Sequence, residues 1–254
     1  MTLLLPPRLT ASAEALRDAA RRRGLRTVHL STSTVPADVR AEHLHAGPGF
    51  ADIVAPALNI ALLQAPEDWL ARLPREFTGR EITFGPIRDA YDLRRPAFVK
   101  SPNDKQIPAL VYTDGSRLPG PDSVDPHMPV LISDVVEFVT EYRLYLLNGT
   151  VHTGSQYAQR GRLSPGPLHK DAAAFGTELL AECRDTLPSA IVVDVGMADG
   201  RWSVIEANAA WASGMYASDP QRALDVVLQA AGPFDAVIPG DHDFLRLPGP
   251  FRRT

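Results

Sequence analysis

The sequence is poor in cysteine and has no long hydrophobic run, and each absence narrows the class of protein. Cys183 is the single cysteine among 254 residues, which excludes an internal disulfide framework and a zinc site built from several cysteines. No segment reaches the ~18 consecutive apolar residues that span a bilayer. The Met1–Pro7 segment, with no basic residue before it, is too short for the apolar part of a signal peptide. Together these absences predict a cytoplasmic protein without a membrane partner.

Lysine and net positive charge are scarce as well. The net charge is −4 and the pI is near 6.0, so a nucleic-acid partner is not expected. Of the 26 basic residues only Lys100, Lys105 and Lys170 are lysine, and two of them lie five residues apart. Either a compact ammonium is required at these two positions or the pairing is chance, and the count alone favours neither. Hydrophobic residues at 44% and charged residues at 22% are typical of a globular chain of one or two domains.

Familiar catalytic motifs are also absent. The sequence has no glycine-rich phosphate loop ending in Gly-Lys-Ser/Thr, no Gly-x-Gly-x-x-Gly after a strand, no His-Glu-x-x-His and no Gly-x-Ser-x-Gly. His43 and His45 share one side of an extended segment, but no third ligand is near, so a loop position is favoured over a metal site. The chemistry must therefore come from a less local arrangement of residues.

The first third of the chain alternates strand and helix patterns. We expect strands over residues 3–5, 27–30, 59–63 and 81–84, and helices over 10–23, 50–57 and 66–73. Gly24 ends the first of these helices, and the arginines in its last turn suit the helix dipole. This alternation predicts an N-terminal α/β domain over residues 1–85.

From Ala97 onward the pattern is dominated by strands. We expect them over residues 97–100, 109–112, 130–139, 142–147, 151–157, 191–197 and 202–207, with helices over 171–185 and 219–231. An Asn148-Gly149 turn joins two of these strands. Residues 86–254 are thus predicted to form a second, α+β unit, which ends in a Pro- and Gly-rich tail over 232–254.

One hairpin carries the strongest chemical pattern. Val204, Glu206 and Asn208 alternate onto one face of a strand, and Asp194 lies on the strand before it. A three-residue loop over 198–200 would place Asp194 on the face of Glu206, whereas a two-residue loop would turn Asp194 to the opposite face. Carboxylate and amide oxygens are ligands that suit Mg²⁺. The alternative, a hairpin with solvated acids, fits less well because these polar residues end an otherwise apolar strand.

This hairpin resembles the closing metal-binding hairpin of the ATP-grasp superfamily, whose signature is Asp and then Leu or Ile, Glu, any residue and Asn. The resemblance implies an ATP-grasp fold preceded by an N-terminal α/β domain, with Mg²⁺ held by Asp194, Glu206 and Asn208. It covers about residues 97–216 and is closest to a short bacterial and phage branch of the superfamily. It also divides the second unit into a smaller nucleotide-covering part over 97–133 and a metal-binding part over 134–231.

Further motifs follow in the order of the superfamily and imply an ATP site. Lys100 resembles the strand lysine that contacts the nucleotide phosphates, and Lys105 would be a second phosphate contact. Glu141 resembles the acid that holds the ribose hydroxyls, and Arg143 stands where related ligases carry a phosphate-binding arginine. Arg143 and Lys105 are the expected catalytic residues, because they would neutralise phosphate charge. The backbone of the hinge before them would bind adenine, through Asp134, Val135, Val136, Glu137 and Phe138.

Two departures from the superfamily pattern concern the phosphates. The loop that covers them is thin in glycine, with only Gly115 and Gly120. The arginine that many members place two residues before the metal aspartate is Val192 here. Either Arg143 replaces its charge, or the phosphates are held more loosely.

The resemblance implies an ATP-dependent carboxylate–amine ligase that forms an amide through an acyl phosphate on small-molecule or amino-acid substrates. The alternatives are a kinase on the same fold and, less favoured because the metal ligands are retained, a non-catalytic ATP-binding protein. Tyr157, Arg160 and Trp211 are candidate substrate contacts, each equally well explained by packing or by a surface position. Members of the superfamily are often dimers, so a homodimer is compatible with the resemblance.

Overall fold

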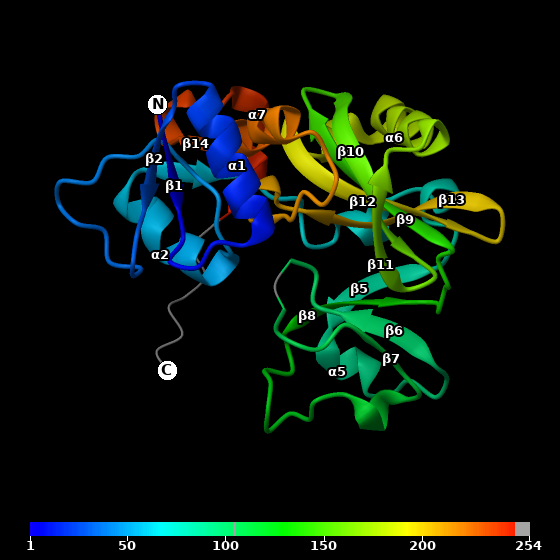
Figure 1. The fold of residues 1–254 in the computed structure, drawn as a ribbon. Helices are drawn as coiled ribbons and strands as arrows, with labels where there is room; N and C mark the ends of the chain where they lie inside the picture. The colour runs from blue at the N-terminus through cyan, green and yellow to red at the C-terminus, as the bar shows by residue number, and fades with distance from the viewer. Residues whose placement is uncertain (104, 247–254) are drawn as a thin grey trace.

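The protein has three parts, which Figure 1 shows as an N-terminal unit, a large sheet with its helices and a small sheet below them. The structure is a computed structural model that describes residues 1–103 and 105–246. Its helices are α1 (Ala11–Arg22), α2 (Pro48–Ala57), α3 (Trp69–Arg72), α4 (Arg75–Thr78), α5 (Ile87–Ala90), α6 (Lys170–Cys183) and α7 (Pro220–Ala230). Its strands are β1 (Thr2–Leu5), β2 (Arg26–His29), β3 (His43–Leu44), β4 (Ile60–Leu62), β5 (Ile82–Pro86), β6 (Ala97–Lys100), β7 (Leu110–Tyr112), β8 (Pro129–Ser133), β9 (Thr140–Leu147), β10 (Thr150–Gln159), β11 (Arg162–Pro167), β12 (Ala190–Ala198), β13 (Arg201–Asn208) and β14 (Ala231–Pro233).

The N-terminal unit is built on a parallel three-stranded sheet in the order β2-β1-β3. The central strand β1 is fully buried because its Leu3–Leu5 run is apolar at every position. Helix α1 begins where the Thr10 hydroxyl accepts a hydrogen bond from the Ala13 amide, and it packs Leu16 against this sheet. The predicted α/β character of this part is confirmed.

The two histidines of β3 and its following residue are buried, so their expected loop position is wrong. Nδ1 of His43 is 2.8 Å from the Leu228 carbonyl oxygen, and Nε2 of His45 is 3.1 Å from that of Ser213. Both rings are therefore held by backbone groups of the second unit and tie the two units together.

The small sheet is antiparallel in the order β5-β8-β6-β7 and packs on α5. Its core contains Ile87, Val99 and Val130, none of which is exposed. Strand β5 was expected in the N-terminal domain over 1–85, but it pairs with β8 instead. Strand β8 ends at Ser133, so the strand expected over 130–139 stops where the hinge begins.

The large sheet is antiparallel in the order β11-β10-β9-β12-β13. Leu144 of β9 points to one face and packs with α6, while Tyr145 points to the other face and packs with α7. Both residues have no exposed surface, so β9 lies between two hydrophobic cores. This double burial makes β9 and β12 a rigid platform for the polar residues on them.

The tail expected over 232–254 is ordered as far as it is described. Strand β14 pairs with β4, and the Arg246 guanidinium forms a two-bond ion pair with Asp52 of α2, at 2.7 and 2.9 Å. Residues 247–254 of that tail lie outside the described residues. No helix in the described part of the chain is long and apolar enough to cross a membrane.

Candidate nucleotide and metal site

The hairpin of β12 and β13 brings the predicted metal ligands together, but by a different route from the expected three-residue loop. The loop has two residues, Asp199 and Gly200, with φ of 49° and 74°. This register alone would turn Asp194 away from Glu206. A β-bulge at Ile205 shifts the register by one residue, so that Asp194 pairs directly with Glu206. The two carboxylates therefore lie on the same face of the sheet.

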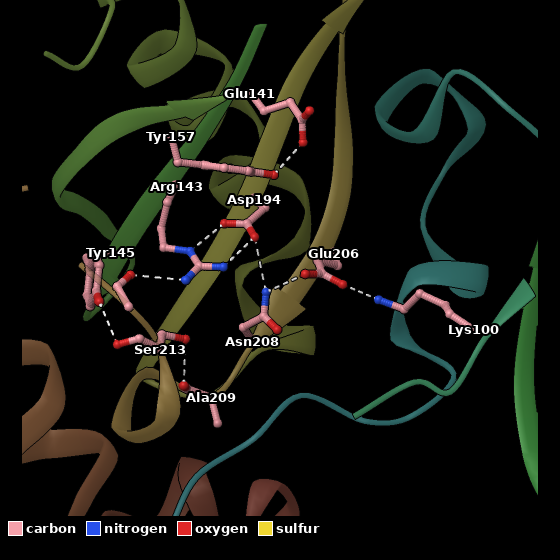
Figure 2. A network of polar contacts seen from close by, with 11 residues as sticks. Lys100, Glu141, Arg143, Tyr145, Tyr157, Asp194, Glu206, Asn208, Ala209 and Ser213 are labelled. Atoms are coloured by element: carbon pink, nitrogen blue, oxygen red, sulfur yellow. Dashed lines mark hydrogen bonds and ion pairs between the residues drawn. The ribbon is translucent and has the colours of Figure 1, made fainter. Parts of the chain in front are cut away.

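Asp194 is held by Arg143, which lies opposite it on β9. Nε of Arg143 donates to Oδ1 at 2.8 Å and Nη2 to Oδ2 at 2.7 Å, and Nη1 donates to the Gly214 carbonyl oxygen at 3.0 Å (Figure 2). Arg143 is 9% exposed and Asp194 1%. Burial alone would lower the pKa of Arg143, but the charge and hydrogen bonds of Asp194 outweigh it and raise the pKa. The guanidinium is thus a permanent cation beneath the site.

Glu206 and Asn208 complete the polar cluster on β13. Nδ2 of Asn208 is 2.9 Å from Oε1 of Glu206 and 3.2 Å from Oδ2 of Asp194. Lys100, at the end of β6, reaches across from the small sheet and donates to Oε2 of Glu206 (Figure 2). Burial opposes the charged form of Glu206, but the Lys100 ammonium and these hydrogen bonds lower its pKa. Glu206 is therefore an anion at neutral pH.

The donor set fits Mg²⁺ in its chemistry. Asp194, Glu206 and Asn208 supply two carboxylates and an amide on neighbouring strands, and Mg²⁺ prefers a few such oxygens together with water and phosphate. No cluster of three or more His, Cys, Asp and Glu side chains suited to a metal exists in residues 1–103 and 105–246. This set therefore fits a metal that is shared with a phosphate ligand and does not resemble a closed structural site.

A cavity of about 760 Å³ lies beside this cluster, between the small and the large sheet. Many of the residues predicted to bind the nucleotide line it, namely Lys100, Lys105, Asp134, Val135, Val136, Phe138, Glu141, Glu206 and Asn208. Its inner end is charged, whereas Phe98, Ile107 and Val111 make its wall on the small sheet apolar. A molecule with a flat apolar end and an anionic end matches this distribution.

The hinge closes one side of the cavity. Phe138 packs on Gly196 of β12, where any Cβ atom would stand 2.5 Å from the Phe138 ring. Asp134 joins the hinge to the residue before β5, because its amide donates to the Glu81 carbonyl oxygen and its carboxylate accepts from the Glu81 amide, both at 3.2 Å. The ring and the backbone around it thus form a fixed edge of the apolar end.

Glu141, at the start of β9, faces the cavity together with Tyr157 of β10. The Tyr157 hydroxyl donates to Oε2 of Glu141 at 2.7 Å. Burial raises the pKa of Glu141, and burial together with the nearby carboxylates raises the pKa of Tyr157. The Tyr157 ring stacks on Tyr216 at 5.1 Å, and both rings cover the Arg143 guanidinium. Glu141 is thereby oriented towards the cavity before any ligand binds.

Five predicted site residues do not line the cavity. Arg143 and Asp194 are buried behind it, and Glu137 lies on the hinge away from it. Arg160 is exposed at the β10–β11 turn. Trp211 is 1% exposed in the hydrophobic core and its indole donates to the Leu63 carbonyl oxygen at 2.8 Å, so it is not available to a substrate.

Sequence reasoning missed two residues near the site. Tyr216 has φ of 50°, an uncommon conformation for an aromatic residue, and its stacking on Tyr157 carried no sequence signal. Arg80 lines the cavity and is only 8% exposed. It resembles the other arginines of this Arg-rich chain, so its burial could not be distinguished in the sequence.

Comparisons with known proteins agree with this geometry. The family model that matches residues 77–226 describes an ATP-grasp domain, the second family of its clade. No curated protein matches the sequence. Among solved structures, the fold is similar to that of an ATP-grasp RimK domain protein from Sphaerobacter thermophilus, with a TM-score of 0.55 and 14% identity over 89% of this chain and 99% of that chain.

Two other solved structures share the fold at similar distances. D-alanine–D-alanine ligase from Bacillus anthracis has a TM-score of 0.51 and 11% identity over 90% of this chain and 96% of that chain. The ATP-grasp ligase PsnB, complexed with a phosphomimetic variant of its minimal precursor, Mg and ADP, has a TM-score of 0.51 and 10% identity over 90% and 98%. At these identities the likeness concerns the fold.

Proposed function

Because this chain belongs to the ATP-grasp domain family, we propose that it is an ATP-dependent carboxylate–amine ligase. The observation that carries the proposal is the cluster of Lys100, Glu206, Asn208 and Asp194 at the charged end of a cavity between two sheets. This arrangement offers cations and oxygen ligands for a metal–triphosphate next to an apolar slot for a base. The substrates are small-molecule or amino-acid carboxylates and amines.

The residues divide the binding of ATP among them. Phe138 and the hinge backbone take the adenine, and Glu141 accepts hydrogen bonds from the ribose hydroxyls. Lys100 and Lys105 pair with the phosphates, which neutralises charge that develops during phosphoryl transfer. Lys100 must leave Glu206 to do so.

Asp194, Glu206 and Asn208 would hold Mg²⁺, which would supply further charge neutralisation at the β- and γ-phosphates. Arg143 acts on this set indirectly, since its guanidinium is fully engaged by Asp194 and Gly214. It orients the Asp194 carboxylate and keeps it ionised. We therefore assign Arg143 a positioning role in place of the expected phosphate contact.

The proposed reaction has two steps. A carboxylate oxygen of the substrate attacks the γ-phosphorus, the bond to the β-phosphate bridging oxygen breaks, and ADP leaves from the resulting acyl phosphate. A neutral amine then attacks the acyl carbon, loses a proton, and displaces inorganic phosphate to leave an amide. No covalent enzyme intermediate is needed, so the chain's residues bind, orient and shield the reacting groups.

A screen of ATP consumption with hydroxylamine tests this proposal. The purified chain is incubated with ATP, Mg²⁺ and a panel of amino acids and dipeptides, and ADP is measured with and without added amines. A ligase forms ADP only with its carboxylate, and hydroxylamine converts the acyl phosphate to a hydroxamate. A stable phosphorylated product without hydroxamate would identify a kinase, and nucleotide binding without ADP formation across the panel would identify a binding protein. Either of these outcomes contradicts the proposal.

A further inference from the structure

Arg80 is a buried cation held mainly by backbone oxygens. It lies between α4 and β5, and its Nη1 donates to the carbonyl oxygens of Val204 at 2.9 Å and Thr78 at 3.0 Å. Its Nη2 donates to the Ile205 carbonyl oxygen at 3.3 Å. Within the described residues it forms no ion pair. Burial lowers its pKa to about 10, so it remains charged at neutral pH without a paired carboxylate.

The two carbonyl groups that Arg80 binds on β13 belong to the β-bulge of that strand. In the register set by the two-residue loop, Glu206 would stand opposite Val193, on the face that packs with α6. The bulge at Ile205 moves Glu206 to the other face, opposite Asp194. Because β13 is the edge strand of the large sheet, no further strand can bind the carbonyl groups on its outer side. Arg80 supplies the donors that a neighbouring strand would otherwise provide.

The segment before Arg80 is shaped for this contact. Gly79 has φ of 64°, and a Cβ atom there would stand 2.5 Å from Oγ of Ser203, the residue before the bulge. The chain can approach β13 this closely only because residue 79 has no side chain. The Arg80 guanidinium also lies 5.6 Å from the centre of the Phe138 ring. One side chain therefore contacts the bulge, the hinge and the cavity at once.

We propose that Arg80 is a positioning residue that holds the bulge at Ile205 and thereby keeps the Glu206 carboxylate on the face of Asp194. The inference rests on the proposed role of Glu206 as a metal ligand. Arg80 acts on the metal through β13 and is not itself a ligand. Its loss should therefore weaken the binding of metal together with nucleotide more than the binding of nucleotide alone.

The experiment compares Arg80→Met with Arg80→Lys by calorimetry, using ADP with and without Mn²⁺ as the probe. For Arg80→Met we expect metal-free ADP affinity within about threefold of wild type and a loss of about tenfold or more in the enhancement by Mn²⁺, a typical coupling between sites. Arg80→Lys keeps the charge but a single nitrogen replaces the fork, so it should lose an intermediate part of the enhancement. Arg75→Met, an exposed arginine of α4, should match wild type.

Hydrogen exchange gives a readout that does not depend on ligand. Faster exchange in Arg80→Met should be confined to residues 201–208 and their partners on β12, with α1 and α7 unchanged. If Arg80→Met does not fold, Arg80→Lys carries the test on both measurements. Wild-type enhancement by Mn²⁺ in Arg80→Met, or in Arg80→Lys, would overturn the inference. Absence of any enhancement in the wild-type protein would instead overturn the metal assignment on which it rests.

Discussion

Lys100 of β6 donates a hydrogen bond to Glu206 of β13, so one ion pair joins the small sheet to the large sheet across the cavity. The contact places a phosphate-binding candidate on a metal-ligand candidate. In the absence of ligand the ammonium neutralises the carboxylate. Both residues must exchange partners when a metal–nucleotide complex occupies the cavity.

Glu206→Gln should abolish most activity without unfolding the protein. The substitution keeps the shape and one oxygen but removes an anionic ligand, and we expect turnover to fall by about two orders of magnitude or more. Turnover at saturating Mg²⁺ and the melting temperature check this. Asp199→Asn, in the loop of the same hairpin, is the control and should behave as wild type. A Glu206→Gln enzyme with wild-type turnover would contradict the metal assignment.

Lys100→Arg should impair the enzyme although the charge is kept. The side chain is 8% exposed, and a longer planar guanidinium does not fit where a compact ammonium meets Glu206. We expect roughly a tenfold or greater loss in kcat/KM for ATP. Steady-state kinetics measure it, with Lys170→Arg on the exposed start of α6 as the matched control. Equal kinetic constants in both variants would show that Lys100 has no special role.

Glu141→Ala should weaken ADP and ATP binding alike, since both carry the ribose. Loss of a hydrogen bond to a charged group costs about 1.5–3 kcal/mol, or about 10–150-fold in affinity. Titration calorimetry with ADP measures the change. Tyr157→Phe removes only the hydroxyl that orients Glu141 and should have a smaller effect. Unchanged ADP affinity in Glu141→Ala would exclude it as the ribose ligand.

Arg143→Met should destabilise the fold itself. Asp194 would be left as an unpaired buried carboxylate, at a cost of about 3–5 kcal/mol. For a chain of this size that corresponds to a fall in Tm of about 6–20 °C. Adding Asp194→Leu removes the stranded charge and should recover much of the loss. A double variant no more stable than Arg143→Met would show that the two side chains are not coupled.

Asp225 predicts a pH-dependent junction between the two units. It joins α7 to Arg23 at 2.6 Å and to His152 at 2.8 Å. Burial opposes its charge, but these two partners lower its pKa. A depressed pKa stabilises the fold above the unfolded value near ~4, and this stabilisation is lost as the pH falls through the folded pKa.

Asp225→Asn should therefore lower Tm at pH 7 by about 1–4 °C, as expected for a partly exposed ion pair. The difference from wild type should shrink towards pH ~3.5, below the unfolded value of the carboxyl group. Thermal unfolding across this range measures it, with the exposed Asp185→Asn as control. A difference that grows as the pH falls would have the wrong sign.

Strong local patterns predicted much of this fold. The apolar Leu3–Leu5 run, the capped and amphipathic α1, and the alternation of Glu206 with Asn208 each leave a signal within a few residues. They specify a strand, a helix and a polar strand face whatever surrounds them. The family resemblance then supplied the order in which such pieces assemble.

The remaining features depend on single residues or on distant partners. Asp199-Gly200 is the dipeptide typical of a two-residue turn and could have indicated the loop, but nothing in the sequence marks the compensating bulge at Ile205. Trp211 has the composition of a binding residue and is buried because Leu63 lies 148 positions away. Arg80 is one of 23 arginines, and only its tertiary partners set it apart.

The pairing of Ile82 with Ser133 has a topological consequence. The chain leaves the large domain at the start of β5 and returns at the end of β8, and neighbouring strands are only about 5 Å apart. Residues 82–133 are therefore an insertion whose ends nearly touch, and the large domain keeps a continuous path without them. Such a segment can be lengthened, shortened or exchanged by evolution without redrawing the rest of the molecule, which makes the apolar wall of the cavity the most independently variable part of the site.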